Sequence, residues 1–112
     1  MNRLAQKKKV CALIPARLNS VRFPGKALKR IDGIPMVVRV LAAARDSGVF
    51  DAVYAATDSP EIAAVCQTYG FEAVFTSHSH QNPTSRIQEA VTILAHSASS
   101  AEIFFWEYAF NI

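Results

Sequence analysis

Short continuous apolar runs alternate along this sequence with stretches in which apolar residues recur at helical spacing. The runs 10–14, 52–56 and 71–76 have the length of β-strands, and their lack of polar alternation is typical of strands buried on both faces. A fourth strand is expected from residue 103 onward, where the chain is again apolar and aromatic. The helical spacing predicts three helices between these strands, over residues 36–46, 58–69 and 82–96.

Cap and turn residues delimit the predicted helices. Pro35 suits the first turn of the first helix, and Gly48 suits its C-terminal end. The stretch Asp58-Ser-Pro-Glu61 is typical of a helix start, with Asp58 or Ser59 as the N-cap. Because a cap accounts for the Asp58 carboxylate without any chemistry, we interpret Asp58 as a cap residue rather than a catalytic one.

The alternation of strands and helices predicts an α/β fold. We expect a three-layer sandwich in which helices cover both faces of a mostly parallel sheet. The 112 residues allow one domain, 1–112. Ligands of such sheets bind beyond the carboxyl ends of the strands. The loops that leave the first strand (15–35) and the third strand (77–86) are therefore expected to open on the same edge, where a ligand could bind.

Composition excludes several functional classes. The net charge is +3, and four of the twelve basic residues lie in the first nine positions, so residues 1–8 are interpreted as a basic, solvated lead-in. The remaining charge is nearly balanced, which predicts neither nucleic-acid nor membrane binding. No stretch approaches the roughly 18 apolar residues of a membrane span. Cys11 and Cys66 lie in apolar runs, which favours reduced, buried thiols in a cytoplasmic protein.

The loop after the first strand concentrates fixed positive charge. Arg17, Arg22 and Lys26 lie between Pro15 and the end of a Pro-Gly-Lys stretch. Arginine forks and a lysine point charge suit phosphate oxygens, and glycine lets the backbone approach a ligand closely. A nucleoside triphosphate would fit this loop, but a solvated loop with cations paired elsewhere has the same pattern. The spacing of a Walker loop is absent.

Four short motifs carry a family resemblance. The sequence contains I-P-A-R at 14–17, R-F-P-G-K at 22–26, G-I-P-M at 33–36 and H-Q-N-P-T-S-R at 80–86. In this order they resemble the N-terminal half of the sugar-acid cytidylyltransferases of the 3-deoxy-manno-octulosonate (KDO) type, also called CMP-KDO synthetases. The family patterns are I-P-A-R, R-x-P-G-K, G-x-P-M and H-Q-S-G-T-E/D-R. The resemblance extends over residues 9–96.

The resemblance implies a nucleotide-diphospho-sugar transferase (Rossmann-like) fold and a cytoplasmic cytidylyltransferase. Such enzymes transfer CMP from CTP to the anomeric hydroxyl of a sugar acid and release pyrophosphate, which activates a lipopolysaccharide precursor. The implied nucleotide contacts are Pro15, Ala16 and Arg17 in the first loop, Arg22 and Lys26 at the triphosphate, and Gln81 and Arg86 near the base and ribose. Arg17 and Lys26 are the predicted catalytic residues, and the implied partners are CTP and a sugar acid.

The sequence also departs from the family pattern. Asn82-Pro83 stands where the family has Ser-Gly, and Ser85 replaces an acidic residue. The Asn-Pro pair is expected to start a helix whose N-terminus faces the nucleotide. A sialic or related nonulosonic acid is the alternative to a KDO-type substrate.

The Mg²⁺ that the resemblance implies lacks its usual ligands in this sequence. The family holds the metal with the Asp of a Q/N-G-D-E-P loop and with a later Asp, and neither motif is present. Glu107 is interpreted as a poor substitute, and His78, His80 and His96 as polar loop or surface residues. We therefore expect no metal ligand here and little pyrophosphate release. An inactive nucleotide-binding fragment is the alternative function.

The last segment, 101–112, is an atypical aromatic tail. It holds five of the eleven aromatic residues, which are Phe104, Phe105, Trp106, Tyr108 and Phe110. This shift in composition favours an incomplete domain from a truncated or frame-shifted product, with a naturally short protein as the alternative. The family's homodimer remains open because its dimer-forming region is absent from this sequence. An apolar strand edge of this kind is expected to self-associate.

Overall fold

The computed structural model describes residues 9–18, 24–77, 82–97 and 103–107. Every strand and helix that the sequence pattern predicts is present, and one short 3₁₀ helix and two short strands are added. The elements are β1 (Lys9–Pro15), η2 (Lys26–Leu28), β2 (Arg30–Ile31), β3 (Ile34–Pro35), α1 (Met36–Asp46), β4 (Ala52–Thr57), α2 (Pro60–Thr68), β5 (Glu72–Phe75), α3 (Pro83–Ser97) and β6 (Ile103–Glu107).

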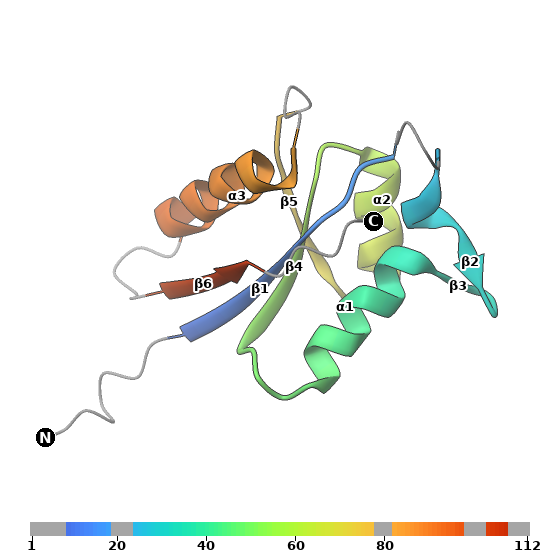
Figure 1. The fold of residues 1–112 in the computed structure, drawn as a ribbon, viewed down its shortest axis with the longest axis horizontal. Helices are drawn as coiled ribbons and strands as arrows, with labels where there is room; N and C mark the ends of the chain where they lie inside the picture. The colour runs from blue at the N-terminus through green and yellow to red at the C-terminus, as the bar shows by residue number, and fades with distance from the viewer. Residues whose placement is uncertain (1–8, 19–23, 78–81, 98–102, 108–112) are drawn as a thin grey trace, which may run out of the picture.

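The main sheet is parallel and has the order β5-β4-β1-β6 (Figure 1). The chain proceeds outward from β1 to β4 and β5, and then returns to place β6 on the other side of β1. The strand order therefore reverses beside β1, and ligands of open α/β sheets bind beyond the carboxyl ends at such a position. Pro15 pairs with Ala56, and Thr57 pairs with Phe75, so three strands end at the same edge.

Helices cover both faces of this sheet, which confirms the predicted three layers. One core cluster joins Ile14 and Ala55 to buried residues of α1 and α2. The other joins Leu13 and Ala56 to Ile87 and further residues of α3. Neighbouring residues of β1 and β4 thus face opposite cores, because side chains alternate along a strand. This explains why both strands are continuous apolar runs.

The Asp32-Gly33 turn lies within the predicted loop 15–35 and closes a hairpin between β2 and β3. Asp32 has φ 53° and Gly33 has φ 83°, the two positive values that a tight two-residue hairpin turn requires. The guanidinium of Arg39 on α1 donates from Nε and Nη2 to the carbonyl oxygen of Ile31, at 2.9 and 2.5 Å. The hairpin is therefore attached to the helix that follows it.

The start of α2 has the cap that the sequence predicts at Ser59. Its side-chain oxygen accepts a hydrogen bond from the N–H of Ile62 at 3.2 Å, and Pro60 follows in the first helical turn. Gly70, with φ 87°, lies just beyond the end of this helix. Within the described ranges, the helices fall short of the length and apolar character that a bilayer-spanning segment needs.

Cys11 and Cys66 are both buried and form no disulfide, as the apolar runs predict. Burial raises the pKa of the Cys66 thiol to about 11, from an ordinary value of 9.0. Between these values the unfolded chain has released a proton that the native protein keeps. The contribution of Cys66 to the free energy of unfolding is therefore constant well below pH 9, and it falls by about 2 kcal/mol as pH rises toward 11.

We expect urea unfolding to show this decline between pH 9 and about pH 11 in the wild-type chain. The control is Cys66→Ala, which is less stable at every pH because a buried side chain is shortened. It retains all other titrating groups, so its decline over this interval should be shallower. Parallel pH profiles for the two proteins would contradict the assignment.

Candidate nucleotide site

The first predicted site residues lie where β1 leaves the sheet. Pro15 and Ala16 are both buried, and the N–H of Ala16 donates to the carbonyl oxygen of Ala56 at 2.9 Å, one step beyond the end of the strand. Arg17 follows and is exposed. The backbone is therefore fixed by pairing with β4 up to the residue before this arginine, and Arg17 is presented beyond the carboxyl edge of the sheet.

The base of the same loop is closed by the backbone. The N–H of Gly25 donates to the carbonyl oxygen of Leu18 at 2.9 Å, and Gly25 has φ 74°, which favours glycine. Lys26 then begins η2, which is anchored by Ala27 at 0% exposure. Arg17 and Lys26 consequently lie on either side of one closed loop base. Residues 19–23, including Arg22, are outside the described residues, as is Gln81.

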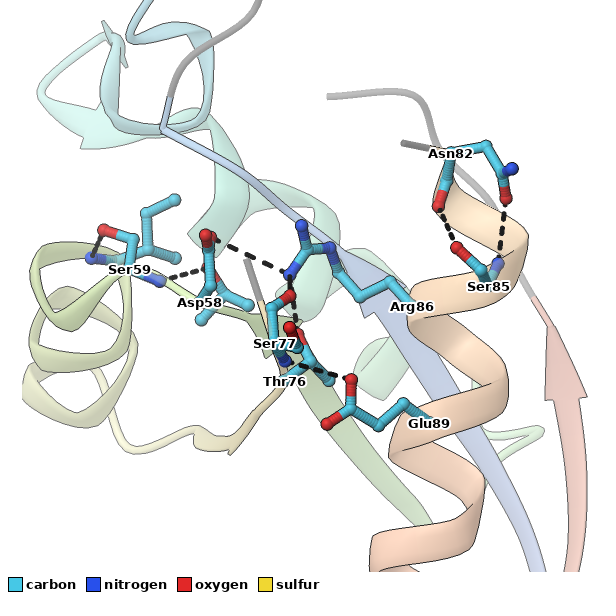
Figure 2. A network of polar contacts seen from close by, with 10 residues as sticks. Asp58, Ser59, Thr76, Ser77, Asn82, Ser85, Arg86 and Glu89 are labelled. Carbon is cyan, nitrogen blue, oxygen red and sulfur yellow. Dashed lines mark hydrogen bonds and ion pairs between the residues drawn. The ribbon is translucent and has the colours of Figure 1, made fainter. Parts of the chain in front are cut away.

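Arg86 comes from the beginning of α3 and is 4% exposed. Its Nη1 donates to Thr76 Oγ1 at 2.6 Å and to the carbonyl oxygen of Ser77 at 3.3 Å (Figure 2). The same nitrogen lies 3.7 Å from Asp58 Oδ1. Thr76 and Asp58 follow the ends of β5 and β4, so this arginine connects a helix to the carboxyl ends of two strands.

The structure corrects the interpretation of Asp58 as a helix cap. Ser59 caps α2, whereas the Asp58 carboxylate pairs with Arg86. The two partners are 28 positions apart in the sequence, and capping rules consider only neighbours. The sequence did contain a signal for a buried arginine. Arg86 directly precedes Ile87, on the side of an amphipathic helix that faces the core, and an arginine buried there requires a partner.

Two further residues that the sequence reasoning missed, Thr76 and Glu89, fix the chain as it leaves β5. The N–H of Thr76 donates to the carbonyl oxygen of Thr57 at 2.9 Å, which extends the pairing of the strands. The N–H of Ser77 donates to Glu89 Oε1 at 2.9 Å, while its carbonyl accepts from Arg86. Residues of α3 therefore hold both backbone groups of Ser77 (Figure 2).

The departure from the family pattern at Asn82-Pro83 has a structural explanation. Asn82 Oδ1 accepts a hydrogen bond from the N–H of Ser85 at 2.9 Å, which is the contact of an N-cap, and Pro83 opens the helix. The prediction that this pair starts a helix is confirmed. Ser85 also donates from its hydroxyl to the Asn82 carbonyl oxygen at 3.2 Å.

The described residues do not fit the Mg²⁺ site that the resemblance implies. Among them, no three His, Cys, Asp or Glu side chains gather as metal ligands. Asp58, which follows β4 at the relevant edge, is paired with Arg86. His96 is exposed and its Nδ1 lies 3.1 Å from the Thr92 carbonyl oxygen, while His78 and His80 are outside the described residues. No chemical step is therefore assigned to a metal.

Comparison with known proteins agrees with this geometry. The Cytidylyltransferase family model matches residues 11–105. A 3-deoxy-manno-octulosonate cytidylyltransferase of Neisseria meningitidis (serogroup A) is 54% identical over 82 residues, which are 73% of this chain and 32% of the relative. The enzyme of the same name from a Nitratiruptor species is 49% identical over 86 residues, 77% of this chain and 35% of the relative.

A solved structure extends the likeness to the fold. A CMP:2-keto-3-deoxy-manno-octonic acid synthetase complexed with CTP superposes with a TM-score of 0.74 at 32% identity, over 89% of this chain and 40% of that one. The chain thus spans about a third of the length of the curated relatives described above. The family model, the sequence relatives and the fold all agree that this chain belongs to the cytidylyltransferase family.

Proposed function

We propose that this chain binds CTP and forms the nucleotide-binding part of an enzyme that transfers CMP to a KDO-type sugar acid. The observation that carries the proposal is the basic loop at the carboxyl end of β1, where the strand order reverses. The names of the two related enzymes support the sugar acid, and the CTP complex of the structural neighbour supports the nucleotide.

Arg17 and Lys26 have the chemistry that the transfer requires. Attack of the sugar hydroxyl on the α-phosphorus forms the new P–O bond and expels pyrophosphate, so negative charge increases on the phosphoryl oxygens. Fixed cations at this position stabilise that charge. They lower the activation barrier most when they are already in place before the reaction begins. Because strand pairing fixes the backbone before Arg17, and η2 anchors Lys26, both are suited to this role.

The remaining site residues complete the proposed contacts. The backbone at Pro15 and Ala16 borders the nucleotide, Arg22 adds charge at the triphosphate, and Gln81 and Arg86 contact the base and ribose. Mg²⁺ remains a prediction of the family resemblance, because the described residues supply no ligand cluster for it.

A nucleotide comparison by thermal unfolding tests the proposal. A ligand that binds only the native state stabilises it by about 2.7 kcal/mol at a hundred times its Kd, which raises the melting temperature. We expect millimolar CTP to raise the melting temperature of this chain more than the same concentration of UTP or ATP, since base contacts accompany the phosphate contacts. Equal shifts with all three would contradict a cytidine site, and no shift with any would contradict nucleotide binding.

A further inference from the structure

Arg86 uses only one end of its guanidinium group for the contacts described above. Each of the three contacts involves Nη1, and the described residues provide no partner for Nη2 or Nε. In Figure 2 the Nη2 end is turned away from Thr76 and Asp58. No side-chain nitrogen in the described part of the chain is both sealed from solvent and without a partner. The other end of this group, whose side chain is 5% exposed, therefore retains access to the surface.

The charge of Arg86 is only partly balanced by its partners. The two hydrogen bonds go to neutral oxygens, and the carboxylate of Asp58 is beyond hydrogen-bond distance at 3.7 Å. A buried cation requires compensation for the water it has lost. A guanidinium that is fixed at one end, with unused donors at the other, is arranged to bind a further acceptor or anion.

The group that orients Arg86 is itself rigidly held. Thr76 is 7% exposed, and its N–H is bound to the Thr57 carbonyl oxygen at 2.9 Å. Its hydroxyl makes the shortest of the three contacts with Arg86, at 2.6 Å. The position of the guanidinium is thus defined by the carboxyl end of β5, and Asp58 constrains it from the end of β4.

We propose that Thr76 and Asp58 are positioning residues that aim the free end of Arg86 at the nucleotide. This inference rests on the proposed CTP site and extends it to two residues that the sequence did not identify as nucleotide contacts. Thr76 orients the guanidinium through its hydroxyl, and Asp58 does so through charge. Neither residue touches the ligand in this proposal.

Substitutions at Thr76 separate positioning from simple stabilisation. Thr76→Val keeps the shape and removes the hydroxyl, whereas Thr76→Ser keeps the hydroxyl. We expect Thr76→Val to weaken CTP binding about tenfold and to narrow the preference for CTP over UTP, because a misaligned Arg86 contacts the base less well. Thr76→Ser should restore both values to within about twofold of the wild type. Asp58→Asn should show a smaller loss of the same kind.

The matched control is Thr92→Val on α3, which removes an exposed hydroxyl that donates to the Gln88 carbonyl oxygen. It should leave CTP affinity and nucleotide preference unchanged. If Thr76→Val lowers the melting temperature but retains wild-type affinity and preference, the contact is only a structural brace and the inference is overturned. If the wild-type chain does not bind CTP, the proposed function itself is contradicted. That result differs from a wild-type chain that binds CTP and a Thr76→Val variant that binds it equally well, which contradicts only the positioning role.

Discussion

Replacing Arg86 with methionine is expected to cause the largest loss of stability among the variants considered. The substitution leaves the Thr76 hydroxyl and the Ser77 carbonyl without their donor, and it leaves the Asp58 carboxylate without its cation. Removal of one partner from a buried charged network typically costs about 3–5 kcal/mol, and partial exposure of Asp58 places our expectation at about 3 kcal/mol. For a domain of ordinary stability, about 5–15 kcal/mol, this is a large fraction.

Urea unfolding in the absence of nucleotide measures this loss. The control is Arg30→Met, because Arg30 is exposed and donates to the Gly33 carbonyl oxygen within the hairpin. It should change the unfolding free energy by no more than about 0.5 kcal/mol. An Arg86→Met protein as stable as the control would show that the network contributes little to the fold.

The second large effect concerns nucleotide binding. Removing the charge of Lys26 in Lys26→Met is expected to weaken CTP binding by about 1.5–3 kcal/mol, roughly tenfold to a hundredfold, since a hydrogen bond to a charged group is lost. Arg17→Met should have an effect of the same order. Stability should change much less than for Arg86→Met, because Arg17 is exposed and Lys26 is only half-buried.

The sequence predicted the fold well because the relevant signals are local. Strands buried on both faces produce continuous apolar runs, and the Asp32-Gly33 pair identifies its own turn. The order of the strands could not be predicted in this way. The alternation of strands and helices is compatible with β6 pairing with either β1 or β5. The observed pairing of β6 with β1 depends on which face of the sheet α3 covers.

The candidate site was only partly predictable for a related reason. The cations of the first loop, Arg17, Arg22 and Lys26, lie within one short stretch of sequence, so the concentration of positive charge could be recognised from the sequence. The partners of Arg86 come from two separate segments, one after β4 and one after β5, and sequence rules treat an arginine as exposed unless a partner is known. The assignment of Asp58 to a helix cap was wrong. Its position before Pro60 was enough to explain a carboxylate there, and no neighbouring residue indicated that Arg86, 28 positions away, is its partner.

Calorimetric titration of CTP tests the central claim most directly. The proteins to compare are the wild-type chain, Lys26→Met and the control Lys29→Met, which removes an exposed charge three positions further on. The account predicts measurable heat for the wild type, affinity at least tenfold weaker for Lys26→Met, and affinity within about twofold of the wild type for Lys29→Met. An absence of binding by the folded wild-type chain, or equal affinity for all three proteins, would contradict it.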